Sequence, residues 1–207
     1  MTRTAATTLI MQRLGKRTGL DADVVVELQQ AQLDLELGEF LPWFLTKALS
    51  GLTTTANVRA VALPSDFLRE TDHKWWLTTT DGAKELYKGS YDELYARERF
   101  GSDYLTSNYY AIVGTSMYHF PTPTTAMAIE GFYFAKDATL AAAETENNWL
   151  TWAPGVLVAK AGMRMGRTLR DEQVIGLFKE DYIEAYNKLI AANIAREQAA
   201  LNAVMGG

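Results

Sequence analysis

Asn147-Asn148-Trp149-Leu150-Thr151-Trp152-Ala153-Pro154 opens the last third of the chain, and the rest of the fold is organised around the segment that follows it. From Trp149 to Met165 the chain is rich in Ala, Leu and Val, which predicts a helix, and a proline near the first turn is compatible with one. A longer helix is expected from about residue 172 to 203, because apolar residues recur there at helical spacing. Such a helix spans about 45 Å, more than the expected diameter of the fold, so its end is predicted to project.

Residues 199–207 end the chain without a charged side chain. An uncharged and mildly apolar tail after a long helix indicates a contact with a partner. The alternative is a terminus that is only frayed.

The first part of the chain is expected to form two helices of opposite charge. Residues 4–15 can form a short helix, and the segment 3–17 holds four bases and no acid, whereas 21–39 holds six acids and no base. In the second helix apolar residues recur at spacings of three, four and seven, which predicts that they share one apolar face. They are Val26, Leu33, Leu37, Phe40 and Phe44. Pro42 is expected to kink this helix or to start a new turn.

The middle of the chain changes to short β-branched and aromatic runs. Tight turns are expected at Asp81-Gly82 and Gly114-Thr115, and residues 91–100 have helical spacing. The expected strands are 58–63, 74–79, 84–87, 109–113, 117–120 and 126–134. The sequence therefore predicts an α+β protein. N-terminal helices in 1–57 and C-terminal helices in 137–207 form one helical bundle, and 58–136 is an inserted, mainly antiparallel β region of about five or six strands.

Composition excludes several classes of protein. Hydrophobic residues make up 48% of the chain, which is enough for a core and too much for a disordered protein. The absence of cysteine excludes disulfides, zinc–thiolate sites and cysteine nucleophiles. The net charge of −5 argues against broad, non-specific binding of nucleic acid. No apolar run is long enough for a signal peptide or a transmembrane helix, so the protein is expected in the cytoplasm where it is made.

No residue pattern predicts an enzyme, a cofactor site or a metal site. The two histidines, His73 and His119, are too far apart in the sequence for a clustered ligand set and are expected to be structural. Residues 162–167 contain glycines but lack the preceding strand and the following Lys-Ser/Thr of a phosphate loop. Two acidic pairs fall on faces that are expected to be solvated: Glu144/Glu146 and Glu180/Asp181.

An arginine series and a tryptophan pair are open to more than one interpretation. Arg164, Arg167 and Arg170 fall along one side of an expected helix. They indicate either a basic strip facing nucleic acid or an acidic neighbour, or a solvated helix end whose cations suit the helix dipole. Trp75 and Trp76 fall in an expected strand, so one ring is expected in the core and the other on the surface as an anchor or interface residue.

Four stretches of the chain, in order, carry a resemblance to a known family. They are 28–45 (Leu-Gln-Gln-Ala-Gln-Leu-Asp-Leu-Glu, then Gly38 and Phe-Leu-Pro-Trp-Phe-Leu), 63–69 (Leu-Pro-Ser-Asp-Phe-Leu-Arg), 118–123 (Tyr-His-Phe-Pro-Thr-Pro) and 131–154 (Gly-Phe-Tyr-Phe-Ala-Lys, then Asn-Trp-Leu and Ala-Pro). Their order and spacing resemble the head-to-tail adaptor, or connector, proteins of tailed bacteriophages across nearly the whole chain. Gly162 and Gly166 depart from the smoother Ala/Leu helix that is common in that group.

The resemblance implies a structural protein of the virion. Such adaptors form a ring, typically of twelve copies, beneath the portal at the unique capsid vertex, where the ring continues the DNA channel and the tail docks. The implied partners are the other copies of the ring, the portal protein, a tail or nozzle protein and DNA in transit, with no membrane. The implied location is the head–tail junction of the virion, after assembly in the host cytoplasm.

The resemblance also implies where partners bind, since in related adaptors a C-terminal segment reaches the portal and a β region faces the tail. The implied portal contacts are Arg196, Leu201, Val204 and Met205. The implied subunit or tail contacts are Trp43, Trp75 and Tyr110. The bases of 3–17 and the acids of 21–39 can pair between subunits or within one. The alternative function is a nucleic-acid-binding packaging accessory protein that uses Arg164, Arg167 and Arg170.

Overall fold

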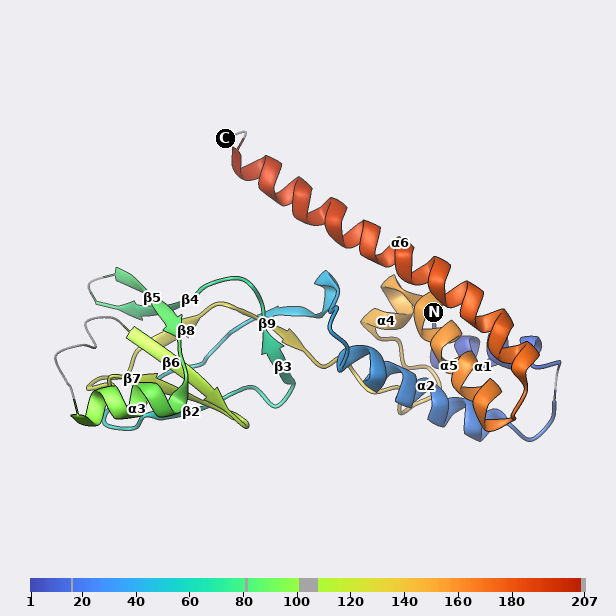
Figure 1. The fold of residues 1–207 in the computed structure, drawn as a ribbon, viewed down its shortest axis with the longest axis horizontal. Coiled ribbons are helices and arrows are strands. Elements are labelled where there is room, and N and C mark those ends of the chain that lie inside the picture. Colours follow the sequence, from blue (N-terminus) through green and yellow to red (C-terminus); the bar gives the residue numbers. More distant parts are fainter. Residues whose placement is uncertain (16, 81, 101–107, 206–207) are drawn as a thin grey trace. The chain divides into compact units, whose positions relative to one another are not determined.

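The computed structural model describes residues 1–15, 17–80, 82–100 and 108–205, with side chains up to residue 199. It divides into a helical unit, Met1–Leu45 with Asp137–Gly207, and a β unit, Thr46–Lys136. This confirms the predicted α+β fold, in which a β-rich insert interrupts a helical body (Figure 1). The sequence places the start of the insert at residue 58, whereas the β unit begins at Thr46. The reason is that β1 (Thr46–Ala48) pairs with β9 (Phe132–Ala135) of the same unit.

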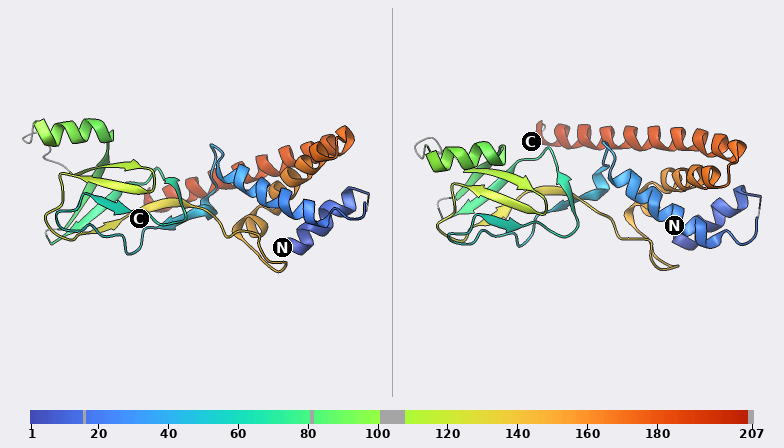
Figure 2. Two further views of the ribbon diagram at one scale, coloured as in Figure 1. Left: turned by 90° about the horizontal axis from the view of Figure 1, so that it is seen from below. Right: turned by 60° about the horizontal axis from the view of Figure 1, so that its bottom comes forward.

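The helix α5 (Pro154–Thr168) is the centre of the helical unit. The side chains of Val156, Leu157 and Met165 are buried, and burying such a side chain contributes about 1.5–3 kcal/mol. The helices that pack on α5 are α1 (Arg3–Arg13), α2 (Asp21–Glu36), α4 (Asn148–Trp152) and α6 (Glu172–Met205). With 34 residues α6 is about 50 Å long, and it lies along α5 as one unbroken helix (Figures 1 and 2).

The chain breaks between α4 and α5, where the sequence predicts one continuous helix. Ala153 leaves the helical region, with φ −138° and ψ 46°, and Pro154 then occupies the first turn of α5. A proline disfavours the α conformation in the residue before it, and its own missing N–H costs nothing at a helix start. Asn147 caps α4 by accepting the backbone N–H of Leu150 at 2.9 Å.

The buried face of α2 is not the face that carries Val26, Leu33 and Leu37. Val24 and Leu28 are buried in the helical unit, whereas Val26, Leu33 and Leu37 are 53%, 42% and 71% exposed. The three residues share one face, as the spacing predicts, but α2 carries apolar side chains on two faces, and the contacts with α1 and α5 use the other one. The helix also ends at Glu36, and a short 3₁₀ turn, η1 (Trp43–Leu45), follows the proline at position 42.

Two glycines of α5 allow α6 to approach closely. A Cβ at position 162 would overlap the ring of Phe178, and a Cβ at position 166 would lie 2.8 Å from Cγ1 of Ile175. Gly162 and Gly166 therefore do not interrupt α5. They are the positions at which side chains of α6 rest directly on its backbone.

A buried polar network joins α2 to the segment before α4. Gln32 donates from Nε2 to Glu36 Oε1 at 2.8 Å, and Asn147 donates from Nδ2 to Gln32 Oε1 at 3.0 Å. The backbone N–H of Asp137 also donates to Glu36, at 3.2 Å. Burial raises the pKa of Glu36, although the hydrogen bonds from Gln32 and Asp137 act in the opposite direction. The carboxyl group is thus accommodated by donors that come from both parts of the helical unit.

The β unit contains two sheets. One has the strand order β1-β9-β3, with β3 at Phe67–Glu70, and the other has the order β2-β7-β6-β5-β4-β8. Neighbouring strands are antiparallel except β5 and β6, which are parallel and are joined through α3 (Tyr91–Phe100), the crossover that a parallel pair requires. The strands of the larger sheet are β2 (Ala60–Ala62), β4 (Trp75–Thr79), β5 (Gly82–Lys88), β6 (Asn108–Val113), β7 (Ser116–Phe120) and β8 (Ala128–Glu130).

The expected strand 126–134 is two strands that belong to different sheets. Gly131 separates β8 from β9, and a Cβ at this position would lie 2.5 Å from Cδ1 of Trp75. The strand β3 is also absent from the predicted set. The described part of the insert therefore has more strands than the sequence predicts. The turn at Gly114 is confirmed, with φ +60°, and β4 and β5 form the expected antiparallel pair, although Asp81 lies outside the described residues.

His119 of β7 is buried in the β unit, as expected for a structural histidine. Its Nδ1 lies 2.7 Å from the carbonyl oxygen of Pro121, so we assign the proton to this nitrogen. Nε2 is buried and has no hydrogen-bond partner among the described residues. Burial lowers the pKa of His119, and the hydrogen bond to Pro121 and the charge of Glu98 oppose this only in part.

The close approach of α5 and α6 gives a first prediction. Gly162→Ala forces the Phe178 ring away and should lower the free energy of unfolding by about 1–3 kcal/mol, measured by urea denaturation. The control is Gly176→Ala in α6, where no atom lies within 4 Å of the added Cβ, and this change should raise stability by about 0.5–1 kcal/mol. Equal effects of the two substitutions would show that the contact at position 162 is not close.

His119 gives a second prediction. A histidine in the unfolded chain has a pKa of about 6.5. Because the folded pKa is lower, the unfolded state binds more protons below that pH, and the unfolding free energy should fall as the pH decreases from 6.5 towards the folded pKa. The loss is about 1.4 kcal/mol for each pH unit between the two values.

The measurement is the urea unfolding free energy at several pH values between 7.5 and 5. The His119→Asn variant keeps a donor near Pro121 but has no imidazole, so its stability should depend less on pH in this window. NMR titration in a His73→Gln background, where His119 is the only histidine, gives its folded pKa directly. A folded pKa at or above 6.5 contradicts the prediction.

Candidate interaction surfaces

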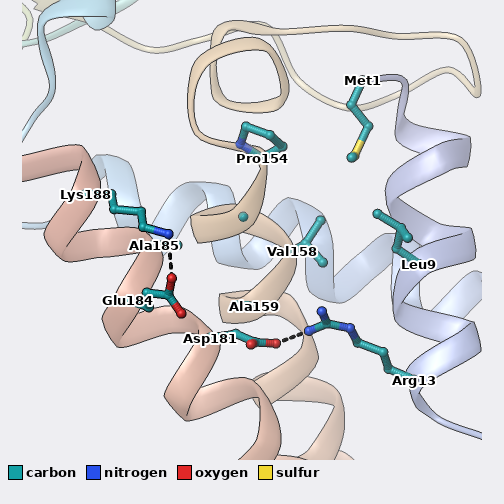
Figure 3. A pocket seen from close by; sticks show the side chains of 11 residues that line it. Met1, Leu9, Arg13, Pro154, Val158, Ala159, Asp181, Glu184, Ala185 and Lys188 are labelled. Carbon is teal, nitrogen blue, oxygen red and sulfur yellow. Dashed lines mark hydrogen bonds and ion pairs between the residues drawn. The ribbon is translucent and has the colours of Figure 1, made fainter. Parts of the chain in front are cut away.

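The helical unit has a groove between α1, α5 and α6 (Figure 3). Val158 and Ala159 of α5 form an apolar floor, and Leu9 stands on the α1 wall. The cavity measures about 290 Å³, at the lower limit of the roughly 300–1,000 Å³ that is typical of small-molecule sites. The groove is therefore better suited to a few apolar side chains than to a cofactor.

Ion pairs form the rim of the groove. Arg13 of α1 pairs with Asp181 of α6, and Lys188 pairs with Glu184 at 2.5 Å within α6 (Figure 3). Both of these acids at the groove are therefore ion-paired with a base. In the part of the chain that the structure describes, no group of three or more His, Asp or Glu side chains can hold a metal ion. No helix among those residues is long and apolar enough to cross a bilayer.

Trp43, Trp152 and Arg196 form a second surface feature, the tryptophan–arginine cluster. The guanidinium carbon of Arg196 lies 4.3 Å from the ring centroid of Trp43 and 5.6 Å from that of Trp152. One turn earlier on α6, Asn193 Oδ1 accepts the backbone N–H of Trp43 at 3.0 Å. Each cation–π contact at an exposed site contributes about 0.5–1 kcal/mol. The cluster thus holds α6, as far as Arg196, against Trp43 and Trp152 of the same unit.

The residues expected to contact the portal lie at and beyond this cluster. Arg196 stacks within its own chain, yet it is exposed like the other residues of 194–199. Leu201, Val204 and Met205 lie in the last part of α6, but their side chains are outside the described part of the structure. Their contact with a portal stays a prediction.

Two of the three residues expected at a subunit or tail interface are in the core of the β unit. Trp75 is 1% exposed, stacks on Tyr110 at 5.1 Å between ring centroids and donates from Nε1 to the Phe132 carbonyl oxygen. Tyr110 is 6% exposed and donates to Glu70, and burial together with this bond raises its pKa. Neither ring offers a surface to a partner. In the tryptophan pair it is Trp76, 38% exposed, that faces outward.

The three arginines do not form a continuous basic strip. Arg164 donates from Nε to Glu27 at 2.6 Å and from Nη1 to Asp34 at 2.8 Å, so α2 neutralises it. Arg170 is not on the same helix, because α5 ends at Thr168 and Arg170 has a positive φ of 54° in the following turn. Only Arg167 and Arg170 remain exposed.

The described bases of the segment 3–17 have partners other than the acids of 21–39. Arg13 binds Asp181, Arg17 binds Asp171 at 2.7 Å, and Arg3 donates to backbone carbonyl oxygens, whereas Lys16 lies outside the described residues. Glu27 and Asp34 of α2 are occupied by Arg164. Asp21 and Asp23 make no ion pair with the described residues.

The sequence does not reveal the groove or the tryptophan–arginine cluster. Residues from three segments line the groove, and Trp43 lies 150 residues from its Asn193 partner. The sequence contains one indication of the groove, which is an apolar residue outside the main helical pattern: Leu9 in a polar helix. Such a residue indicates a surface, but it does not say which other segment completes it.

Comparison with known proteins gives one family. Residues 1–205 match the model of a family described as SU10 adaptor protein. The match covers residues of both units and does not depend on a single motif. No curated protein matches the chain.

The arginine contacts give a third prediction. Arg164→Ala leaves Glu27 partly buried without its cation and should lower the unfolding free energy by about 1–2 kcal/mol, less at high salt. Arg167→Ala is the matched control and should change it by no more than about 0.5 kcal/mol. Equal losses for the two variants, measured by urea denaturation at low and high salt, would contradict this assignment.

Proposed function

Because the chain belongs to the SU10 adaptor protein family, we propose that it forms a ring of twelve copies that joins the portal of a tailed bacteriophage to its tail. A member of this family has a structural role as a phage adaptor and is not an enzyme. The match over residues 1–205 is the observation that carries the proposal. The ring, its copy number, the DNA channel through it and its place at the head–tail junction of the virion are the proposed parts.

The exposed apolar surfaces of the helical unit support assembly with other copies. Val26 and Leu33 are exposed on α2 and Leu37 is exposed directly after it, and the groove between α1, α5 and α6 has an apolar floor. Exposed apolar side chains and apolar grooves mark protein–protein contacts more often than a solvated face does.

The end of α6 is the proposed portal contact. The tryptophan–arginine cluster holds the helix up to Arg196, and the uncharged stretch 199–207 follows. A helix that is held as far as Arg196 presents the residues that follow at a defined place and loses little entropy on binding. Arg196, Leu201, Val204 and Met205 are the residues that we propose for this contact.

The β unit is the proposed side of tail attachment. Trp76 and Tyr87 replace Trp75 and Tyr110 as candidate contacts, since they are 38% and 46% exposed and lie on the outer face of neighbouring strands. Aromatic side chains are enriched at the centre of protein interfaces.

The acidic charge balance suits a passage for DNA more than a binding site for it. Contacts of Lys and Arg side chains with phosphates dominate the affinity for nucleic acid. The chain has a net charge of −5, so its acids outnumber the bases that make such contacts. The packaging alternative depends on a basic strip that includes Arg164, and this residue is already paired with Glu27 and Asp34. The adaptor role is therefore favoured over nucleic-acid binding.

A mixture with the portal protein of the same phage gives a fourth prediction. Native mass spectrometry should detect a complex with twelve copies of the chain on one portal. A monomer in the absence of the portal is compatible with the proposal, because a ring component can require its template. A persistent monomer without portal affinity contradicts it.

The variant for this experiment is a chain that ends at residue 198. It should keep the thermal unfolding midpoint of the full chain and bind the portal at least about ten-fold more weakly, since the uncharged tail is missing. Loss of folding instead would show that the tail is part of the core and not a contact with the portal.

A further inference from the structure

We infer that the portal protein presents a carboxylate side chain to Arg196, and that an apolar side chain next to this carboxylate enters the pocket lined by Trp43 and Trp152. The inference rests on the proposed function. It adds to the proposed portal contact the chemistry of the partner, which is a short acidic segment with a neighbouring apolar residue.

The guanidinium group of Arg196 is held in place within its own chain but is not neutralised there. Its central carbon lies 4.3 Å from the ring centroid of Trp43 and 5.6 Å from that of Trp152. Among the described residues it makes no ion pair and donates no hydrogen bond. A guanidinium group that stacks on aromatic rings keeps its N–H groups at the edge of its plane, where a carboxylate can accept two of them. The cluster therefore presents an oriented cation without an anion.

The acid closest to Arg196 in the sequence is already engaged. Glu197 accepts a hydrogen bond from Nδ2 of Asn193 at 2.6 Å, and Asn193 Oδ1 accepts the backbone N–H of Trp43. Glu197 thus belongs to the frame that holds the cluster and forms no ion pair with its cation. Residues 198–207 contain no acid. An anion for Arg196 is therefore expected from a partner.

A pocket beside the cluster has an apolar lining. It lies between η1, α4, the start of α5 and α6, and its volume is about 320 Å³. The two rings that hold Arg196 line this pocket together with Leu189 and Ala192. No acid belongs to the described lining, and its charged residue, Lys188, is paired with Glu184. The pocket thus suits an apolar side chain, and the unpaired cation lies against the same two rings.

The position of Arg196 on α6 favours the portal as the source of the carboxylate. The part of α6 that the cluster holds ends at this residue, and the uncharged stretch proposed to bind the portal follows it. A partner that covers this stretch therefore lies next to Arg196. Nucleic acid also carries anions, but the net charge of −5 disfavours a phosphate backbone, whose binding depends on several cations. A carboxylate beside an apolar side chain matches both the cation and the pocket.

A matched pair of substitutions tests the role of this cation. Arg196→Gln should weaken binding to the portal protein of the same phage at least about ten-fold, because a hydrogen-bonded charge pair is lost. Arg167→Gln changes the net charge equally at an exposed arginine of α5 that has no ion pair among the described residues, and it should change the affinity less than about two-fold. Thermal unfolding of both variants checks that the fold is kept.

The salt dependence of binding distinguishes a direct charge pair from a structural role of Arg196. A contact between charges weakens as salt is added, so the affinity of the wild-type chain should fall more steeply with salt than that of Arg196→Gln. If Arg196 only positions α6, Arg196→Gln binds more weakly but keeps the wild-type salt dependence. That result overturns the inference.

Zero-length cross-linking identifies the partner residue. Arg196→Lys keeps a cation at this position, and a carbodiimide joins its amine to a carboxylate in direct contact. In the complex with the portal, mass spectrometry of the digested product should find position 196 linked to an Asp or Glu of the portal protein. The wild-type chain shows which products come from other lysines, and Arg167→Lys should add none that contains the portal.

The possible outcomes separate this inference from the proposed function. If the twelve-copy complex forms and Arg196→Gln binds as tightly as the wild type, the portal carboxylate is overturned and the adaptor ring stands. The same holds if position 196 is linked to a second copy of the chain, or if Arg196→Gln loses binding to DNA and not to the portal. A wild-type chain without affinity for the portal overturns both.

Discussion

The helical unit depends on a buried polar network that closes it across the inserted β unit. Gln32 and Asn147 are 115 positions apart in sequence, and their side chains meet between α2 and the segment that leads into α4. A long insertion adds little to the entropic cost of bringing such ends together, because this cost grows only with the logarithm of loop length. The donors must nevertheless be placed accurately, since Glu36 is a buried carboxyl group and would be costly without them.

Once this network brings both parts of the helical unit together, α5 sets the positions of the remaining helices. Its glycines let α6 rest on the backbone at Phe178 and Ile175, so the path of the longest helix follows from two residues without side chains. The groove between α1, α5 and α6 is a consequence of the same packing. The tryptophan–arginine cluster then holds α6 further along, before the uncharged end of the chain.

These constraints suit an adaptor, which needs defined surfaces more than a reactive site. Glu36 and His119, whose pKa values are displaced by burial, are hydrogen-bonded within the fold. The described surface of the helical unit includes the exposed aliphatic side chains of Val26, Leu33 and Leu37, the groove and the tryptophan–arginine cluster. These are surfaces and not reactive sites, in agreement with membership of a structural family.

The sequence by itself determined the fold class and the long C-terminal helix, because these depend on periodicity and on local signals such as the turn at Gly114. It did not determine which face of α2 is buried, since Val24 and Val26 are equally apolar and only the contact with α5 distinguishes them. It also placed Trp75 and Tyr110 at an interface, whereas register in the sheet stacks them in the core. The groove and the cluster were decided by tertiary structure alone, because each combines distant segments whose approach is set by packing and not by local sequence.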